Sequence, residues 1–291
     1  MKTTIKLKLG ILALLFFVQA CSSTDDSQTQ INEPTLEEEL QAIIDSRIGD
    51  DSKLKGASVS IRKGNDELYS LVGGVSEEGI HITSNMRFGI ASITKTAVAA
   101  TVLKLEEEGL LSLDDTIGDH LTISSPNIDN DITIYQLLNH LTGLKGYFQH
   151  PDIWTIIEAN LDVAIPHEDL VDFIGETLFE PGAQYSYSNS NYLILGLIIR
   201  TVAGEEVGAA MRSRFWNPLS LNSTYFGSDE TVVGPIASPW RDNDGNGTLE
   251  NLAPDFRAAY HSVFYTAADI FTTASDLSSW SQHLYNGNAL S

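Results

Sequence analysis

The chain has 291 residues, of which 42% are hydrophobic and 19% are charged, and its formal net charge is −22 at pH 7. A chain of this length and composition can bury a sizeable core, which excludes general disorder. So acidic a protein repels phosphate backbones, which argues against nucleic acid as a partner.

The first 34 residues are predicted to be a targeting region. Residues 1–20 carry three lysines ahead of an apolar run that is too short to span a bilayer, as in a secretory signal. The signal closes on Cys21, the only cysteine of the chain, and resembles a bacterial lipoprotein signal whose cysteine is acylated. A stray cysteine after an ordinary signal peptide is the alternative. Residues 21–34 are polar and lack an apolar period, which is typical of a tether.

Acylation of Cys21 would anchor the protein to a membrane without a transmembrane helix. We therefore expect an exported lipoprotein of the bacterial cell envelope, either periplasmic or surface-facing.

The next elements predict an α+β arrangement. Residues 35–48 have the spacing of an amphipathic helix, and residues 57–62 and 67–72 alternate like strands around a Gly/Asn turn at 63–66. A helix packed on an antiparallel hairpin is an α+β arrangement. The apolar face of the helix would carry Leu36, Leu40, Ile43 and Ile44.

A loop then delivers Ser92 to the first turn of a helix predicted to run to about Glu108 and to end at Gly109. Ser92 and Lys95 are three residues apart, so on a helix their hydroxyl and amine can meet. A serine nucleophile needs such a base, and a lysine can serve only if burial or a neighbouring cation lowers its pKa. The helix N-terminus would also favour an oxyanion beside Ser92.

The Ser-x-x-Lys spacing alone is weak evidence. The spacing occurs three times, and only the third occurrence has a helical context. The second lies on a predicted strand, where residues three apart face opposite sides of the sheet. An N-capping serine with an exposed lysine is the alternative for the bare motif. The three pairs are Ser52 with Lys55, Ser60 with Lys63, and Ser92 with Lys95.

The stretch after the Ser92 helix, ITIYQLLNHLTGL at 132–144, adds a second signature. Together with FGIASITKTAVAATVLKLEEEGLLSLDDTIGDHL it resembles the serine β-lactamase and penicillin-binding-protein superfamily, in particular the class C and D,D-carboxypeptidase-like branch. The resemblance implies an antiparallel sheet flanked by helices, with a helical subdomain. We interpret His140 as structural. The matching positions are Leu137, Leu138, His140, Thr142, Gly143 and Leu144.

A further family motif, Tyr-x-Asn, occurs once, at Tyr187-Ser188-Asn189, between a Pro-Gly turn and an apolar helix predicted at 192–202. The resemblance implies that Tyr187 relays protons near the nucleophile and that Asn189 orients the substrate amide and holds its acyl side chain. An Asn/Ser N-cap with core tyrosines is the alternative for this piece alone.

Two other stretches carry no firm chemistry. Residues 152–176 are predicted to form two helical stretches. Residues 242–250 match the first half of a calcium loop, but position twelve is Ala253 instead of a bidentate Glu, which favours a surface turn rich in Asx residues. No metal or organic cofactor is predicted.

The last stretch, 267–290, resembles the family's segment in which a Thr-Thr-Ala-x-Asp-Leu phrase starts a helix. The family usually has a Gly-Gly pair where Ala268 and Asp269 stand here. Its third motif, Lys-Thr-Gly or His-x-Gly, does not occur. We therefore expect residues 35–291 to be a β-lactamase-like domain that is incomplete at the C-terminus, with sheet strands missing and the hairpin edge at Ala57 unpaired.

These observations predict a serine hydrolase of β-lactamase, D,D-carboxypeptidase or esterase type. Ser92 would attack a β-lactam, a D-Ala-D-Ala-type peptide or an ester, and Lys95 and Tyr187 would share the proton transfers. The partner would be a small-molecule or peptidoglycan-peptide substrate. The alternatives are an inactive homologue that binds cell-wall fragments or a protein, and a surface lipoprotein that binds calcium.

Overall fold

The computed structural model describes residues 33–48, 53–63, 67–242, 244–252 and 257–290. The chain divides into residues 1–35 and residues 36–291, and the elements of the fold belong to the second unit. Cys21 and nearly all of the predicted signal and tether lie outside the described residues. Within those residues, no helix combines the length and the apolar character needed to cross a membrane.

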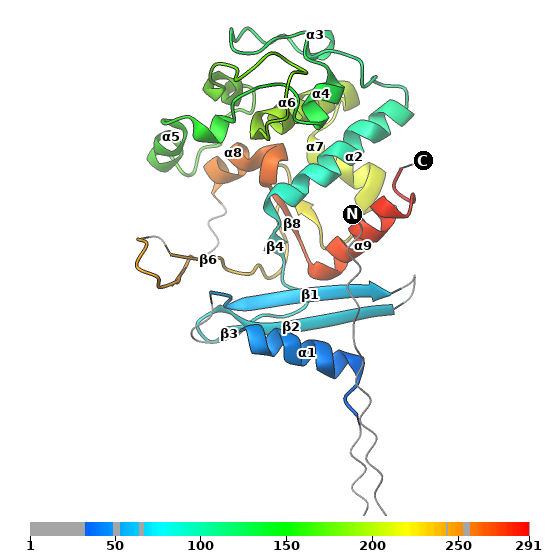
Figure 1. Cartoon of the computed structure of the whole chain (residues 1–291), viewed down its shortest axis with the longest axis vertical. Coiled ribbons are helices and arrows are strands. Elements are labelled where there is room, and N and C mark those ends of the chain that lie inside the picture. The colour runs from blue at the N-terminus through cyan, green and yellow to red at the C-terminus, as the bar shows by residue number, and fades with distance from the viewer. Residues whose placement is uncertain (1–32, 49–52, 64–66, 243, 253–256, 291) are drawn as a thin grey trace, which may run out of the picture. The chain divides into compact units, whose positions relative to one another are not determined.

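An antiparallel sheet forms the first part of the second unit. β1 (Gly56–Lys63), β2 (Glu67–Glu77) and β3 (Ile80–His81) lie in that order, with Ser60 of β1 opposite Ser70 of β2. α1 (Leu36–Arg47) packs on β2, as Figure 1 shows. Among the described residues, no strand pairs with β1 on its other side. The predicted helix and hairpin are therefore confirmed.

The predicted apolar face of α1 is only partly correct. Leu36 and Ile43 are 48% and 58% exposed, whereas Leu40 and Ile44 are half-buried. A Cβ atom added at Gly73 of β2 would lie 3.0 Å from Ile44 Cγ2, so Ile44 is directed at the sheet. The buried stripe of α1 is therefore narrower than the predicted face.

The core lies in a helical body built around α2 (Thr94–Glu107), α6 (Asn189–Ala203) and α8 (Ala258–Ala268), which pack against one another. α6 is apolar around most of its circumference, as expected of a helix covered on all sides. Gly196 allows α6 to approach α8 closely, since a Cβ atom there would lie 2.6 Å from Thr266 Oγ1. α2 ends as predicted, with Gly109 at a φ of 71°.

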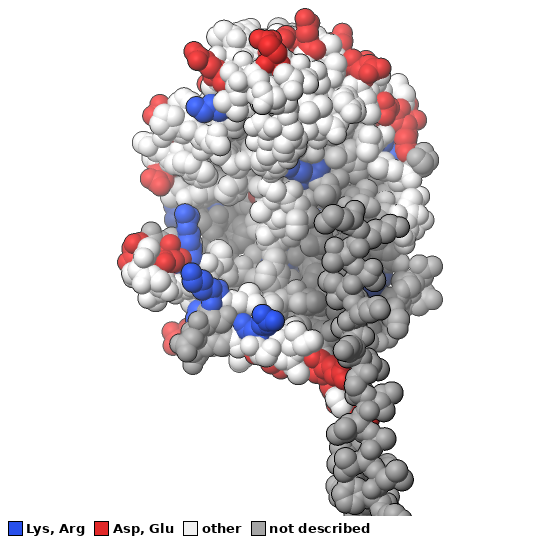
Figure 2. Space-filling view, in the orientation of Figure 1, with Lys and Arg blue, Asp and Glu red and all other residues white. Residues whose placement is uncertain are grey.

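Shorter elements cover this body. Figure 2 shows Asp and Glu side chains spread over the end formed by α3, α4 and α5, in keeping with the large negative charge. The 152–176 stretch forms one α-helix and one 3₁₀ helix. The shorter elements are α3 (Ile117–His120), α4 (Ile134–Leu138), η2 (Tyr147–Gln149), α5 (Ile153–Ala159), η3 (Asp169–Phe173), α7 (Val207–Met211) and η4 (Arg212–Trp216).

A second small sheet connects the helical body to the first sheet. β4 (Phe88–Gly89), β8 (Ile270–Thr272) and β5 (Tyr225–Phe226) pair antiparallel in the order β4-β8-β5. α9 (Ala274–Tyr285) follows β8 and packs against β1, and a groove of about 830 Å³ lies between the two. A hairpin of β6 (Trp240–Arg241) and β7 (Glu250–Asn251) completes the α+β fold.

Candidate active site

The predicted nucleophile lies where β4 passes into α2. Ser92 is exposed in a single 3₁₀ turn, η1 (Ala91–Ile93), directly ahead of α2. Ala91 has a φ of 46°, a left-handed conformation that is uncommon for a residue with a Cβ atom. Ile93 N donates to Ile90 O at 3.1 Å and closes the turn. The backbone therefore presents Ser92 on a tight, strained corner.

Lys95 lies in the first turn of α2, with its Nζ 3.4 Å from Ser92 Oγ. Its side chain is only 6% exposed, and Nζ donates to Ala267 O at 2.6 Å and to Asn189 Oδ1 at 2.9 Å. Burial lowers the pKa of Lys95 from 10.5 to about 8. The physical requirement for a lysine base, a cost on its charged form, is therefore met at this position.

Tyr187 lies on the other side of Ser92. Its hydroxyl donates to Ser92 Oγ at 2.9 Å, and its ring lies 5.1 Å from Lys95 Nζ. The side chain is 48% exposed, so its hydroxyl and that of Ser92 are both open to a substrate.

His140 supports Tyr187 from behind. The two rings are 4.5 Å apart, and Nδ1 of the buried His140 accepts from Ser188 N at 3.2 Å and lies 3.0 Å from Asn191 Nδ2. Burial, helped by the charge of Lys95, lowers the pKa of His140 to about 4. A neutral imidazole with these contacts has a structural role, as its sequence context suggests.

Asn189 is the first residue of α6 rather than part of a loop, and Ser188 caps the helix by accepting from Ser190 N. Asn189 Oδ1 also accepts from Lys95 Nζ, a contact that the sequence did not predict.

The arrangement around Lys95 can orient a base. A neutral amine has two N–H groups and one lone pair. Ala267 O and Asn189 Oδ1 can accept both N–H groups, which leaves the lone pair for the proton of Ser92. The amine would then take up the proton as Ser92 Oγ attacks an electrophile.

Ala267 O and Tyr192 are site groups that the sequence did not reveal. The Tyr192 ring lies 5.4 Å from Lys95 Nζ and closes the pocket of the amine. A backbone carbonyl has no side-chain signature, and Ala267 is 172 residues away from Lys95 along the chain. The only unusual feature of the sequence near Ala267 is that Ala268 and Asp269 stand where the family usually has a Gly-Gly pair.

Residues 244–248 form two Asx turns. Asn246 N donates to Asp244 Oδ1 at 3.1 Å, and Thr248 N donates to Asn246 Oδ1 at 2.7 Å. Gly247 N also donates to Asp242 Oδ2 at 3.0 Å. In the described part of the chain, no group of three or more His, Cys, Asp or Glu residues is arranged to hold a metal ion. Ala253 lies outside the described residues.

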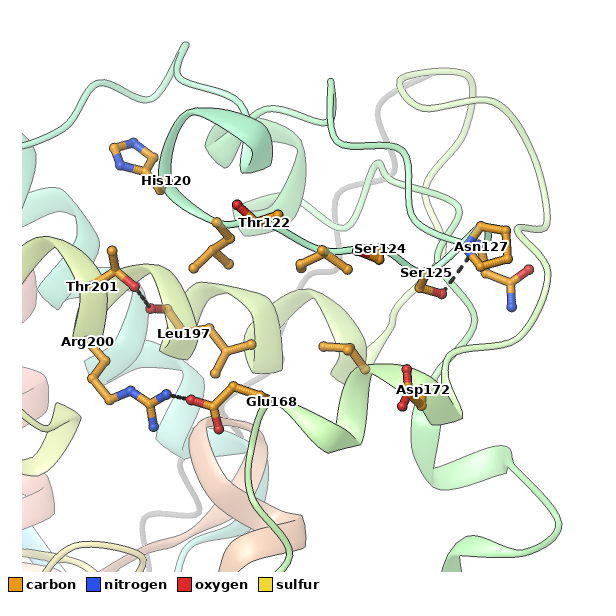
Figure 3. A pocket seen from close by; sticks show the side chains of 14 residues that line it. His120, Thr122, Ser124, Ser125, Asn127, Glu168, Asp172, Leu197, Arg200 and Thr201 are labelled. Atoms are coloured by element: carbon orange, nitrogen blue, oxygen red, sulfur yellow. Dashed lines mark hydrogen bonds and ion pairs between the residues drawn. The ribbon is translucent and has the colours of Figure 1, made fainter.

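A pocket of about 610 Å³ lies elsewhere, along the C-terminal half of α6 (Figure 3). It is walled by the 120–127 segment and by η3, and an ion pair between Arg200 and Glu168 crosses one side. None of Ser92, Lys95, Tyr187 or Asn189 lines it, so its position does not identify the reactive centre.

Comparison with known proteins gives a consistent family. A family model described as Beta-lactamase matches residues 36–291. The chain is 29% identical over 208 residues to Protein flp of Staphylococcus aureus (strain NCTC 8325 / PS 47), covering 70% of this chain and 39% of that protein. It is 25% identical over 229 residues to Penicillin-binding protein 4 of Amycolatopsis lactamdurans, covering 74% of this chain and 57% of that protein. The chain thus spans about two fifths to three fifths of the length of these relatives.

Two solved structures are also similar. A D-stereospecific amidohydrolase from Streptomyces sp. superposes with a TM-score of 0.72 at 26% identity, covering 86% of this chain and 73% of that chain. The D-amino acid amidase from Ochrobactrum anthropi SV3, in complex with D-phenylalanine, superposes with a TM-score of 0.74 at 23% identity, covering 86% and 71%. This second likeness shows a shared fold.

Proposed function

The chain belongs to the Beta-lactamase family, and from that premise we propose that it is a serine hydrolase that works through an acyl-enzyme on Ser92. One observation carries the proposal: Ser92 Oγ accepts from Tyr187 on one side and meets a buried lysine of lowered pKa on the other. A serine hydroxyl becomes a nucleophile when a base of this kind removes its proton.

In the proposed reaction, Ser92 Oγ forms a bond to the substrate carbonyl carbon while its proton passes to Lys95 Nζ. The tetrahedral intermediate collapses as the bond to the leaving nitrogen or oxygen breaks, and Tyr187 donates a proton to that atom. The proton on Lys95 then passes to the Tyr187 oxygen, so that both residues return to their starting protonation states. Water then attacks the acyl carbon and gives one proton to Lys95, the bond from that carbon to Ser92 Oγ breaks, and Oγ takes the proton from Lys95 as the acid product leaves.

The proposed substrate of this hydrolase belongs to one of three classes: a β-lactam, a D-Ala-D-Ala-type peptide or an ester. The names of the similar proteins, which include a penicillin-binding protein and a D-stereospecific amidohydrolase, support testing amides with a D-configured residue first. Asn189 would contact the acyl side chain through its amide, next to Lys95.

The test is intact-mass spectrometry of the protein after incubation with a fluorescent penicillin, a D-amino-acid amide and a nitrophenyl ester, beside Ser92→Ala. A stable penicillin adduct that the variant lacks would support Ser92 as nucleophile and indicate a peptidase with slow deacylation. Rapid turnover without an adduct would indicate a β-lactamase. No adduct and no turnover of any probe would reject the hydrolase and favour a homologue that only binds cell-wall fragments or a protein.

We also propose that the protein is anchored to the cell envelope through acylated Cys21, on the strength of its signal-like N-terminus alone. Detergent-phase partition of protein from an expressing bacterium tests this. Wild-type protein should enter the detergent phase and Cys21→Ser should not; equal partition of the two would reject the anchor.

A further inference from the structure

A second buried polar cluster lies outside the four residues of the candidate site. It consists of Asp269, His261 and Ser228. Asp269 is 2% exposed, and its two carboxylate oxygens lie 2.9 and 3.0 Å from His261 Nδ1. Ser228 Oγ donates to Asp269 Oδ2 at 2.8 Å. Burial raises the pKa of Asp269, and the hydrogen bonds from His261 and Ser228 oppose that rise. A carboxylate this deeply buried depends on such partners.

The cluster does not have the geometry of a second nucleophilic triad. In a triad the serine hydroxyl lies on the imidazole nitrogen opposite the carboxylate. Here the Ser228 hydroxyl contacts the carboxylate itself and also the His261 carbonyl, at 2.9 Å. Its role is therefore to hold the Asp269 carboxylate in place.

The Asp269 carboxylate anchors the C-terminal end of α8. Tyr265 has a φ of 33° and a ψ of −138°, which kinks the helix. A non-glycine residue in such a conformation costs about 1–3 kcal/mol and persists only where its surroundings enforce it. Ala267, whose carbonyl accepts from Lys95 Nζ at 2.6 Å, lies two residues beyond the kink, and Asp269 lies two residues beyond Ala267.

Several contacts, from α8 itself and from other elements, fix Asp269 and its neighbour. Asp269 N donates to Tyr265 O at 3.1 Å, and Asp269 O accepts from Gly227 N at 2.9 Å. Ile270 N donates to Thr94 Oγ1, next to Lys95, at 3.1 Å. A Cβ atom at Gly227 would lie only 2.5 Å from His261 Nδ1, so the loop packs directly on the imidazole. Asp269 is thus held by its backbone and by its side chain.

We propose that His261 is a positioning residue, which acts through the Asp269 carboxylate to hold the kinked 265–269 segment so that the Ala267 carbonyl binds the amine of Lys95. This inference rests on the proposed function, because it takes Lys95 as the base. The His261 imidazole is one of the supports that keep an N–H of Lys95 on Ala267 O and the lone pair on Ser92. When the imidazole is lost, the segment relaxes, water reaches Lys95, and the lone pair loses its direction.

The test compares His261→Phe, which keeps a ring but has no donor, with His261→Asn, whose amide can place a donor near the position of Nδ1. We expect His261→Phe to lower kcat for acylation by about 10- to 100-fold with KM within about twofold, because small misplacements of reacting groups cost this much. His261→Asn should recover most of that loss. Ser228→Ala, which removes only one of the hydrogen bonds, should show a smaller loss of the same kind. His81→Phe, at an exposed histidine of β3, should behave as wild type.

A measurement that needs no substrate separates this inference from the proposed function. NMR titration of ¹³Cε-labelled lysine reports the pKa of Lys95, assigned with Lys95→Met. Tyr187, Tyr192 and His140 are the titratable groups that face this amine, and none of them is changed. In His261→Phe the pKa of Lys95 should rise from about 8 toward its ordinary value and should return in His261→Asn. An unmoved pKa in His261→Phe, or a loss that His261→Asn does not recover, would overturn the positioning role even if Ser92 forms an acyl-enzyme.

Discussion

Two regions of the molecule carry the same Ser-x-x-Lys spacing in different secondary structure. On β1, Ser60 is half-buried, and its hydroxyl lies 2.8 Å from Ser278 Oγ of α9. Positions three apart on a strand fall on opposite faces, and Ser60 pairs with a hydroxyl of another element. At the start of α2, Ser92 and Lys95 share one face and lie 3.4 Å apart.

The difference teaches that the spacing has chemical meaning only where a helix begins and other elements supply partners. Tyr187 contacts Ser92, Asn189 contacts Lys95, and Ala267 provides the carbonyl below the amine. Ser60 lies against the hydroxyl of Ser278 instead. Activity should therefore depend on the α2 pair and not on the β1 pair.

The largest expected effect is that of Ser92→Ala. Removal of the nucleophile should reduce acylation by a probe ester or penicillin by at least about 10³-fold, as for other enzymes that lose a nucleophilic serine. Stopped-flow acylation and intact mass measure it. Retention of more than a tenth of wild-type activity would show that another residue is acylated.

Lys95→Met should come next, with a loss of about 10²- to 10³-fold in the acylation rate, because a positioned base contributes about this much. Lys104→Met on the exposed side of the same helix is the matched control, since it removes only an ion pair with Glu107. Equal rates for the two variants would exclude Lys95 as the base.

Tyr187→Phe should lower the rate by up to about 10²-fold, because it keeps the ring against His140 but removes the hydroxyl bound to Ser92. Tyr185→Phe, at the exposed tyrosine two residues earlier, should leave kcat unchanged. If both variants react at the wild-type rate, the Tyr187 hydroxyl takes no part in proton transfer.

The pH dependence follows from the pKa of Lys95, which burial lowers to about 8. A base acts in its neutral form, and the neutral fraction of Lys95 grows as the pH rises through 8. Acylation should therefore fall about tenfold for each unit below pH 7 and should level off above pH 9. A pH-rate profile of acylation measures it, and a rate that is flat from pH 6 to 9 contradicts a lysine base.

Ser60→Ala should have the smallest effect, within about twofold on acylation. Loss of its hydrogen bond to Ser278 should lower the free energy of unfolding by about 1 kcal/mol, because that is the usual net value of such a bond. Urea unfolding and the ester assay together check the prediction. A large loss of activity would mean that β1 and the reactive centre are coupled, and would contradict the conclusion that activity depends on the α2 pair alone.

Much of the fold could be predicted because periodicity and caps are local. The end of α2, the strands β1 and β2, and the Asx turn at Asp244 follow from residues within a few positions. Ser92 is an exception, because it lies in a separate 3₁₀ turn ahead of Thr94 and not in the first turn of α2. The exposure of Leu36 and Ile43 could not be predicted, since it depends on how α1 is placed against β2. Packing of this kind is a property of the assembled molecule.

The candidate site divides in the same way. The side chains Ser92, Lys95, Tyr187 and Asn189 lie in short recognisable phrases, and the structure brings all four together. Ala267 O could not be predicted because any residue supplies a carbonyl, and its placement depends on the kink at Tyr265. The contacts of His261 also follow only from the tertiary structure.

The left-handed backbone at Ala91 also determines which mutations this corner can accept. Its side chain is exposed, so packing does not require alanine there. Backbone conformation is the filter instead: glycine and asparagine adopt a φ near 46° readily, whereas valine and isoleucine are sterically opposed to it. Position 91 can therefore accept only a few small or turn-forming residues. This restriction preserves the backbone geometry that presents the adjoining Ser92.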